Sequence, residues 1–316
     1  MRCPKCHFDH ELQTTECLKC GIVFSRYRSA VEPEPARDFC VALAPEPLSA
    51  SLPFVDPGDA IRELKCRVFA LPLALLAARL LARTPLQLAA AMLAMVLHES
   101  GHAITAWFTG RWAIPLLWVT PHGQERSWFI VLLLTAGILF GALYAWKTER
   151  WRWVCAAAVA LLLQVIFLSL PAEPTIVFCG DGGALVFSTL LMAGFYTPRD
   201  SSLYKAWGLR WGLLIIGALS FMHVFVLWTG PWEDIPFGEI EGVNLSDPSL
   251  LTEMYGWPET QLVDRYVRLG TICLLALLAV YIWGLVSTYL EFHRSSAPGE
   301  PHHSPATGLA NRTQRL

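Results

Sequence analysis

Six long apolar segments dominate this sequence, and they restrict the folds that it can adopt. They lie at residues 87–108, 128–146, 153–170, 183–197, 211–229 and 269–290. A helix needs about 20 predominantly apolar residues to cross the hydrocarbon core of a bilayer, so these segments predict transmembrane helices. A weaker apolar run at 68–82 contains Pro72 and Arg79, and we expect it to lie in the interface or to re-enter the membrane. The sequence therefore predicts an all-α, multi-pass membrane protein with about six transmembrane helices.

The composition agrees with a membrane protein and argues against one whose main partner is nucleic acid. Of the 316 residues, 54% are hydrophobic and only 16% are charged. The formal net charge is -2, from 24 Lys and Arg against 26 Asp and Glu. Such a chain has no general basic surface to attract a phosphate backbone.

The charges between the apolar segments predict which side of the membrane each loop faces. The loop at 230–264 is acidic and contains no Lys or Arg. Cytoplasmic loops are enriched in Lys and Arg, so we expect this loop to be external and the basic side to be cytosolic. The N-terminus lacks the features of a signal peptide, and we expect it in the cytosol as well. If all six segments cross, the basic residues that fall on one side are Lys147, Arg150, Arg152, Arg199, Lys205, Arg210 and Arg294.

Four of the nine cysteines form the pattern C-x2-C-x10-C-x2-C near the N-terminus, at Cys3, Cys6, Cys17 and Cys20. Two pairs of thiolates with this spacing can hold one tetrahedral zinc ion, which is typical of a structural zinc ribbon. A pair of disulfides is the alternative, but it requires an oxidising compartment, which the missing signal peptide argues against. The remaining cysteines are scattered singly, and we interpret them as apolar packing residues.

The sequence divides into four regions on this basis. Residues 1–28 form the predicted zinc ribbon and residues 29–57 a Pro-rich linker. Residues 58–294 form the membrane domain, and residues 295–316 a polar tail that we expect to be disordered. The ribbon carries few cations, which favours a cytosolic protein partner, or regulation of access to the membrane domain, over nucleic-acid binding.

The pattern H-E-x-x-H occurs inside the first apolar segment, as His98-Glu99-Ser100-Gly101-His102. Residues four apart lie one turn apart on the same face of a helix, so both imidazoles can bind one zinc ion. Glu99 then lies close enough to take a proton from a water molecule at that zinc. Ionisable residues inside a membrane segment are costly and usually mark a functional site. The motif therefore predicts a catalytic zinc held by His98 and His102, with Glu99 as the general base.

A catalytic zinc needs a third protein ligand, and Asp181 is the predicted one. It lies among glycines at the start of the segment 183–197, and no other membrane segment supplies an acidic residue in its interior. We expect the backbone at 171–183 to be irregular, because Pro171 and Pro174 interrupt helix geometry and the glycines allow a close approach to another helix.

Four other polar residues are weaker candidates for the site. Glu239 and Glu241 lie in the acidic loop without a helical pattern around them. His122 is expected in a solvated turn, although a position at the mouth of the site would let it stabilise an oxyanion. His223 is alone in its segment, and we expect it to be hydrogen-bonded inside the helix bundle.

The two motifs together resemble the site-2 protease family of intramembrane zinc metalloproteases, over roughly residues 87–200. The resemblance implies that His98, His102 and Asp181 bind the catalytic zinc and that Glu99 is the general base. It also implies a membrane-anchored protein substrate, cut in or beside its transmembrane helix. The sequence lacks the Asn and Pro pattern that often precedes the family's Asp, and it has no recognisable PDZ insertion. A ribbon fused to such a core also resembles bacterial membrane proteins, which implies the bacterial inner membrane.

Three classes of function are consistent with these features. The first is an intramembrane zinc endopeptidase. The second is a non-catalytic membrane scaffold whose ribbon recruits a partner and whose membrane zinc is structural; Glu99 argues against it, since a structural site needs no base. The third is an ion transporter, which would need further charged residues along a path, and the segments at 128–146, 153–170 and 269–290 have none in their interiors.

Overall fold

The computed structural model describes residue 20 and residues 57–82, 84–198, 201–241 and 244–296. The chain divides into two compact units, Met1–Pro53 and Phe54–Leu316. The first contains the predicted zinc ribbon, of which the structure describes only Cys20. Its other predicted ligands, Cys3, Cys6 and Cys17, lie outside the described residues, as do residues 29–56 of the linker and residues 297–316 of the tail.

The described part of the second unit is built from helices, with a few short elements between them. Its seven long helices are α1 (Pro57–Leu81), α2 (Gln87–Phe108), α3 (Trp128–Lys147), α4 (Trp151–Ser169), α5 (Ala172–Ala193), α7 (Trp207–Thr229) and α9 (Glu259–Ser296). The short elements are η2 (Gly194–Tyr196), α6 (Ser202–Lys205), η3 (Trp232–Asp234), the antiparallel strands β1 (Ile240–Glu241) and β2 (Asn244–Leu245), α8 (Asp247–Ser249) and a π turn, η4 (Leu250–Met254).

Five helices among the described residues are long and apolar enough to cross a membrane. They are α3, α4, α5 with η2, most of α7 and most of α9, and they correspond to five of the six predicted segments. The sixth segment, 87–108, also forms a helix, α2, but it is less apolar because it carries the H-E-x-x-H residues. The coarse prediction of an all-α, multi-pass membrane protein is therefore confirmed.

The predicted irregular stretch at 171–183 is instead helical, and that expectation is wrong. Helix α5 begins at Ala172 and continues through Gly180, Asp181, Gly182 and Gly183. Pro171 is the N-cap and Pro174 lies in the first turn, where a missing N–H group costs no intrahelical hydrogen bond. The prolines therefore start the helix and do not break it.

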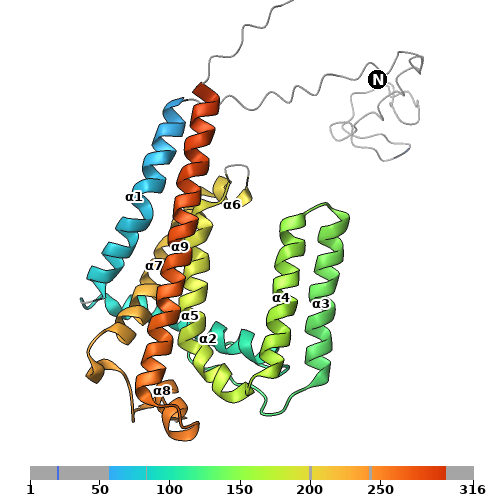
Figure 1. Ribbon diagram of the computed structural model, residues 1–316, viewed down its shortest axis with the longest axis vertical. Coiled ribbons are helices and arrows are strands. Elements are labelled where there is room, and N and C mark those ends of the chain that lie inside the picture. The colour runs from blue at the N-terminus through green and yellow to red at the C-terminus, as the bar shows by residue number, and fades with distance from the viewer. Residues whose placement is uncertain (1–19, 21–56, 83, 199–200, 242–243, 297–316) are drawn as a thin grey trace, which may run out of the picture. The chain divides into compact units, whose positions relative to one another are not determined.

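The weak apolar run at 68–82 lies within α1, a continuous helix that packs against α7 and α9 (Figure 1). The chain does not turn back within this run, so the re-entrant alternative is wrong. A buried ion cluster fixes the start of α1. The carboxylate of Glu63 accepts hydrogen bonds from Arg67 Nε at 2.8 Å and from Arg210 Nη1 at 2.7 Å, and Arg67 Nη2 donates to the carbonyl of Thr197 at 2.8 Å. These bonds join α1 to α7 and to the end of η2.

Basic and acidic connections lie toward opposite ends of this unit. In Figure 1 the turn between α3 and α4, the short helix α6 and the C-terminal end of α9 lie toward one end, and α8 lies at the other. The first group contains the predicted basic side, and α8 belongs to the acidic loop after α7. The arrangement agrees with the sequence-based grouping of charges on two sides.

Helices α2 and α5 approach closely through glycines. A Cβ atom added to Gly101 would lie 2.0 Å from the carbonyl oxygen of Cys179, and one added to Gly183 would lie 2.5 Å from Gly101 Cα. Non-bonded atoms do not approach to these distances. The backbones of α2 and α5 can therefore be this close only because both residues are glycines.

Replacing Gly101 with Ala should therefore destabilise the bundle, by on the order of 1–3 kcal/mol or more, because the methyl group has no room against α5. Thermal unfolding of the detergent-purified protein would measure the effect. Gly137→Ala in α3 is the matched control, since a Cβ there meets no atom within 4 Å. Equal stability of the two variants would contradict the close α2–α5 contact.

Candidate metal centre

The two histidines of the H-E-x-x-H motif face α5 from one side of α2. Their Nε2 atoms are 2.9 Å apart, and their ring planes are nearly perpendicular, at 83°. A Cβ at Gly180 of α5 would lie 2.6 Å from atoms of both rings. The glycine at this position therefore leaves the space that the two imidazoles occupy.

The other nitrogen of each imidazole has a hydrogen-bond acceptor. His98 Nδ1 lies 2.9 Å from Asp181 Oδ1, and His102 Nδ1 lies 2.8 Å from the backbone carbonyl oxygen of Ile176. A carboxylate and a carbonyl can only accept, so both Nδ1 atoms must carry the proton. In a neutral imidazole the Nε2 atom is then an acceptor with a free lone pair. Both residues thus present the tautomer in which Nε2 can bind a metal ion.

A third acceptor comes from the acidic loop between α7 and α9. Asp247 Oδ2 lies 3.3 Å from His98 Nε2 and 3.1 Å from His102 Nε2. Burial of Asp247 favours its neutral form, but positive charge at the two imidazoles outweighs this effect and lowers the pKa of its carboxyl group. A cation between the three side chains, a proton or a metal ion, therefore holds Asp247 in its ionised form.

Three lone-pair atoms cannot lie this close together without a positive species between them. A proton on one Nε2 atom would bridge only one of the three contacts and leave the others repulsive. A metal ion would satisfy all three at once. Ligand atoms of a tetrahedral zinc, each at about 2.0–2.1 Å from the ion, lie about 3.3 Å from one another. The donor set of two imidazoles and one carboxylate, and its spacing, therefore fit a zinc ion, and within the described residues these three side chains are the group able to hold one.

A small hydrogen-bonded turn holds Asp247 in place. Ser246 caps the start of α8, with its Oγ accepting from the backbone N–H of Ser249, and it also donates to the carbonyl of Pro236. Ser249 Oγ accepts from the backbone N–H of Gly238 at 2.8 Å. Both serines are fully buried. The loop is thus anchored on either side of Asp247, which restricts where its carboxylate can lie.

Asp181, the predicted third ligand, is part of the site but occupies a different place in it. Its Oδ1 accepts a hydrogen bond from His98 Nδ1. This nitrogen lies on the other side of the ring from Nε2, the atom that faces His102 and Asp247. Its Oδ2 accepts from Trp228 Nε1 at 2.7 Å. The indole of Trp228 stacks on Tyr266, with ring centroids 4.1 Å apart. In this geometry Asp181 orients His98, as carboxylates behind metal-binding histidines commonly do.

Glu99, the predicted base, is buried in α2 between the two histidines, with 5% of its surface exposed. Its Oε2 atom has no hydrogen-bond partner among the described residues. Its backbone carbonyl accepts from Thr120 Oγ1 at 3.0 Å, which attaches the loop at 109–127 to this part of α2. An unpartnered carboxylate oxygen in a buried position is costly unless water or a ligand reaches it.

The weaker candidates lie outside this cluster. His122 Nε2 is 3.1 Å from Glu173 Oε2, and Arg111 forms an ion pair with the same carboxylate. Glu239 is exposed on the hairpin side of the acidic loop, and the structure does not describe the side chain of Glu241. His223 is half-buried in α7. None of these described side chains joins His98, His102 and Asp247.

Asp247 is not among the residues predicted for the site, although the sequence contains a signal for it. Ser246-Asp247-Pro248 combines an N-cap residue with a proline at the start of a helix, which predicts a rigid turn in an otherwise irregular loop. The loop contains many acidic residues, and the predicted turn indicates that Asp247 is the one held in a fixed position. The sequence does not show that this turn packs against α2.

No protein-family model matches this chain, and no curated protein or solved structure matches it either. The resemblance to the site-2 protease family therefore stays a prediction from the two sequence motifs.

Metal binding should separate the roles of the two aspartates. Asp247→Ala should lower the metal content by one ion per chain, since it removes a ligand. Asp181→Ala should keep the site but weaken it by about 10–100-fold, and Asp181→Asn should bind more tightly than Asp181→Ala because its amide oxygen still accepts from His98. Elemental analysis and chelator competition would measure both. The reverse ranking would make Asp181 the ligand, as the family resemblance implies.

Proposed function

We propose that this protein is an intramembrane zinc endopeptidase, which hydrolyses a peptide bond in or near the transmembrane segment of a membrane-anchored protein. The observation that carries the proposal is the convergence of His98, His102 and Asp247, together with Glu99 in the same turns of α2, whose buried Oε2 atom has no partner among the described residues. Metal ligands alone would suit a structural site. A buried carboxylate oxygen without a partner in the described fold suits a general base.

Each residue of the centre has a distinct task in this mechanism. A zinc ion held by His98, His102 and Asp247 would supply a water of lowered pKa and polarise the scissile carbonyl. Glu99 accepts the proton of the attacking water and later delivers it to the leaving amine. Asp181 and the Ile176 carbonyl hold the two imidazoles in the required tautomer.

The position of the centre along the helices provides the water that hydrolysis needs. Helix α7 joins the buried Glu63 and Arg210 cluster near its start to Trp228 near its end, a rise of about 27 Å. This distance is close to the thickness of the hydrocarbon core. The centre therefore lies level with the end of α7, on the side of the acidic loop, although Asp181 is the tenth residue of α5. If that loop is external, the cut falls toward the external face of the membrane.

The same geometry supports a topology for the chain. Helix α1 starts at the basic end, because Glu63 contacts Arg210, so the residues before it emerge on the side that we propose is cytosolic. Helix α1 is about 38 Å long and packs along α7 and α9, so we propose that it crosses the membrane as the sixth span. Helix α2 then lies at the depth of the metal centre. The predicted zinc ribbon would bind its structural zinc in the cytosol of a bacterium and recruit a protein partner there.

A non-catalytic scaffold is the alternative, and Glu99→Gln distinguishes the two. The variant should keep its zinc, since Glu99 is not among the converging atoms, and should lose peptide hydrolysis by about 10²–10⁴-fold. Cells that express the wild type should contain new protein N-termini within or beside transmembrane segments, detected by N-terminal peptide labelling of the membrane fraction. These termini should be absent with Glu99→Gln.

Ser100→Ala is the matched control, because Ser100 lies in the same motif but its Oγ atom only donates to the carbonyl of Val96. It should behave as the wild type. Identical N-termini in the wild type and in Glu99→Gln, with zinc retained in both, would leave the scaffold as the better account. Iron in place of zinc would instead indicate oxidative chemistry, since two histidines and a carboxylate also bind iron.

A further inference from the structure

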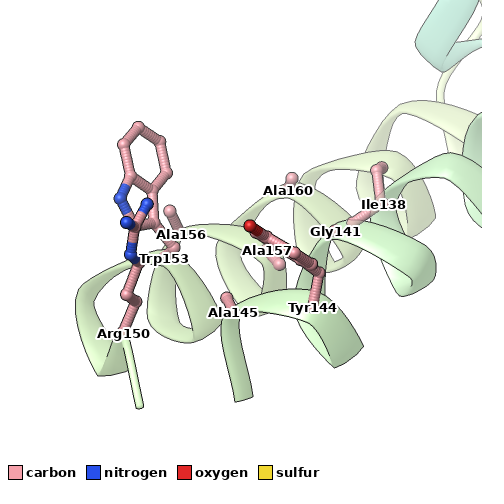
Figure 2. Close-up of a pocket in the computed structure, with 9 residues that line it drawn as sticks. All are labelled: Ile138, Gly141, Tyr144, Ala145, Arg150, Trp153, Ala156, Ala157 and Ala160. Atoms are coloured by element: carbon pink, nitrogen blue, oxygen red, sulfur yellow. The ribbon is translucent and has the colours of Figure 1, made fainter. Parts of the chain in front are cut away.

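The hairpin of α3 and α4 carries a groove that lies apart from the metal centre. The groove has a volume of about 420 Å³, and it is lined by Ile138, Gly141, Tyr144, Ala145, Arg150, Trp153, Ala156, Ala157 and Ala160. Figure 2 shows the side chains of Arg150 and Trp153 standing together at one end and Ile138 at the other. Between them lie small residues, Gly141 and four alanines, and the side chain of Tyr144. One end is thus cationic and aromatic, and the rest is apolar.

The cations at this end are available to a ligand. Within the part of the chain that the structure describes, the guanidinium groups of Arg150 and Arg152 form no hydrogen bond or ion pair. Arg67, Arg111, Arg126 and Arg210, by contrast, are all bonded to carboxylates or carbonyls of the protein. The turn between α3 and α4 also carries Lys147 and a single acidic residue, Glu149. It therefore has an excess positive charge that the fold does not neutralise.

The groove extends from headgroup level into the hydrocarbon layer, which is where the headgroup and the first part of an acyl chain of a lipid lie. Helices α3 and α4 are both candidate membrane spans, so their turn lies at headgroup level, where tryptophans are also enriched. The groove runs from this turn to Ile138, about 10 Å along α3. A Cβ at Gly141 would meet no protein atom within 4 Å, so the space at this residue is open. An acyl chain can lie there while a phosphate reaches Arg150.

We propose that this groove binds an anionic phospholipid, with its phosphate at Arg150 and one acyl chain over Gly141. Charge complementarity favours this occupant over a zwitterionic lipid, because the turn is basic and anionic lipids concentrate in the cytoplasmic leaflet. It also favours a lipid over the apolar face of a second copy, which would bury Arg150 without a partner. The site is independent of the proposed peptidase activity.

Native mass spectrometry of the full-length protein in detergent tests the proposal, with phosphatidylglycerol and phosphatidylcholine as probes. The wild type should bind phosphatidylglycerol more tightly. Arg150→Gln should weaken phosphatidylglycerol binding by about fivefold, which is the effect of one cation at a membrane surface, and phosphatidylcholine binding by less, because its choline group offsets the charge of the phosphate. Gly141→Leu should weaken the binding of both lipids, because its side chain fills the groove.

Two matched variants separate this site from general surface attraction. Lys147→Gln removes one positive charge from the same turn, at a residue that does not line the groove. Gly137→Leu adds a leucine side chain to α3, as Gly141→Leu does, but also at a residue that does not line the groove. Gly137→Leu should bind both lipids as the wild type does, and Lys147→Gln should weaken phosphatidylglycerol binding less than Arg150→Gln does. Equal losses in Arg150→Gln and Lys147→Gln would overturn the proposal in favour of unspecific attraction. A change of oligomeric mass in Gly141→Leu with unchanged lipid binding would assign the groove to a second copy.

Discussion

The close contact between α2 and α5 is the constraint on which the metal centre depends. The H-E-x-x-H motif places two imidazoles on one face of α2, but it fixes neither their tautomers nor their orientation. The contact at Gly101 and Gly183 brings the backbone of α5 near enough for Asp181 and the carbonyl of Ile176 to accept from the two Nδ1 atoms. A side chain at either glycine would separate the helices and break both hydrogen bonds. The absence of side chains at Gly101 and Gly183 therefore determines which nitrogen of each imidazole carries the proton.

The described part of the protein buries charge in two places, and they differ in how their polar atoms are bonded. At the basic end, Glu63 is bonded to Arg67, Arg210 and Tyr204, so its two oxygens are fully used in joining helices. At the other end, acceptors converge without a donor and Glu99 Oε2 has no partner among the described residues. Burying charge is costly in both cases. Only in the first is the cost offset by bonds within the described fold.

The sequence was sufficient to predict the helices and two of the three converging side chains, but not the third. Apolar length predicts a spanning helix directly, and the spacing of His98 and His102 is a local property of one helix. Asp181, the predicted third ligand, lies next to His98, and its part there depends on which nitrogen of His98 it meets, which follows from the α2–α5 packing. Asp247 is distant in sequence from the motif and reaches it only through the fold of a loop. The prolines of α5 were misread because a proline can begin a helix as well as break one.

If the protein is the hydrolase proposed above, a ligand on a loop would resolve a conflict between its reaction and its location. Hydrolysis consumes water, whereas a centre built only from spanning helices would lie in the apolar interior. Asp247 comes from the acidic loop, so it can meet His98 and His102 only near the end of the bundle. The buried turn of Ser246 and Ser249 keeps this loop residue as fixed as one on a helix. The site can therefore be rigid although one of its residues comes from a loop, while Gly180 leaves room for the imidazoles and Trp228 holds Asp181.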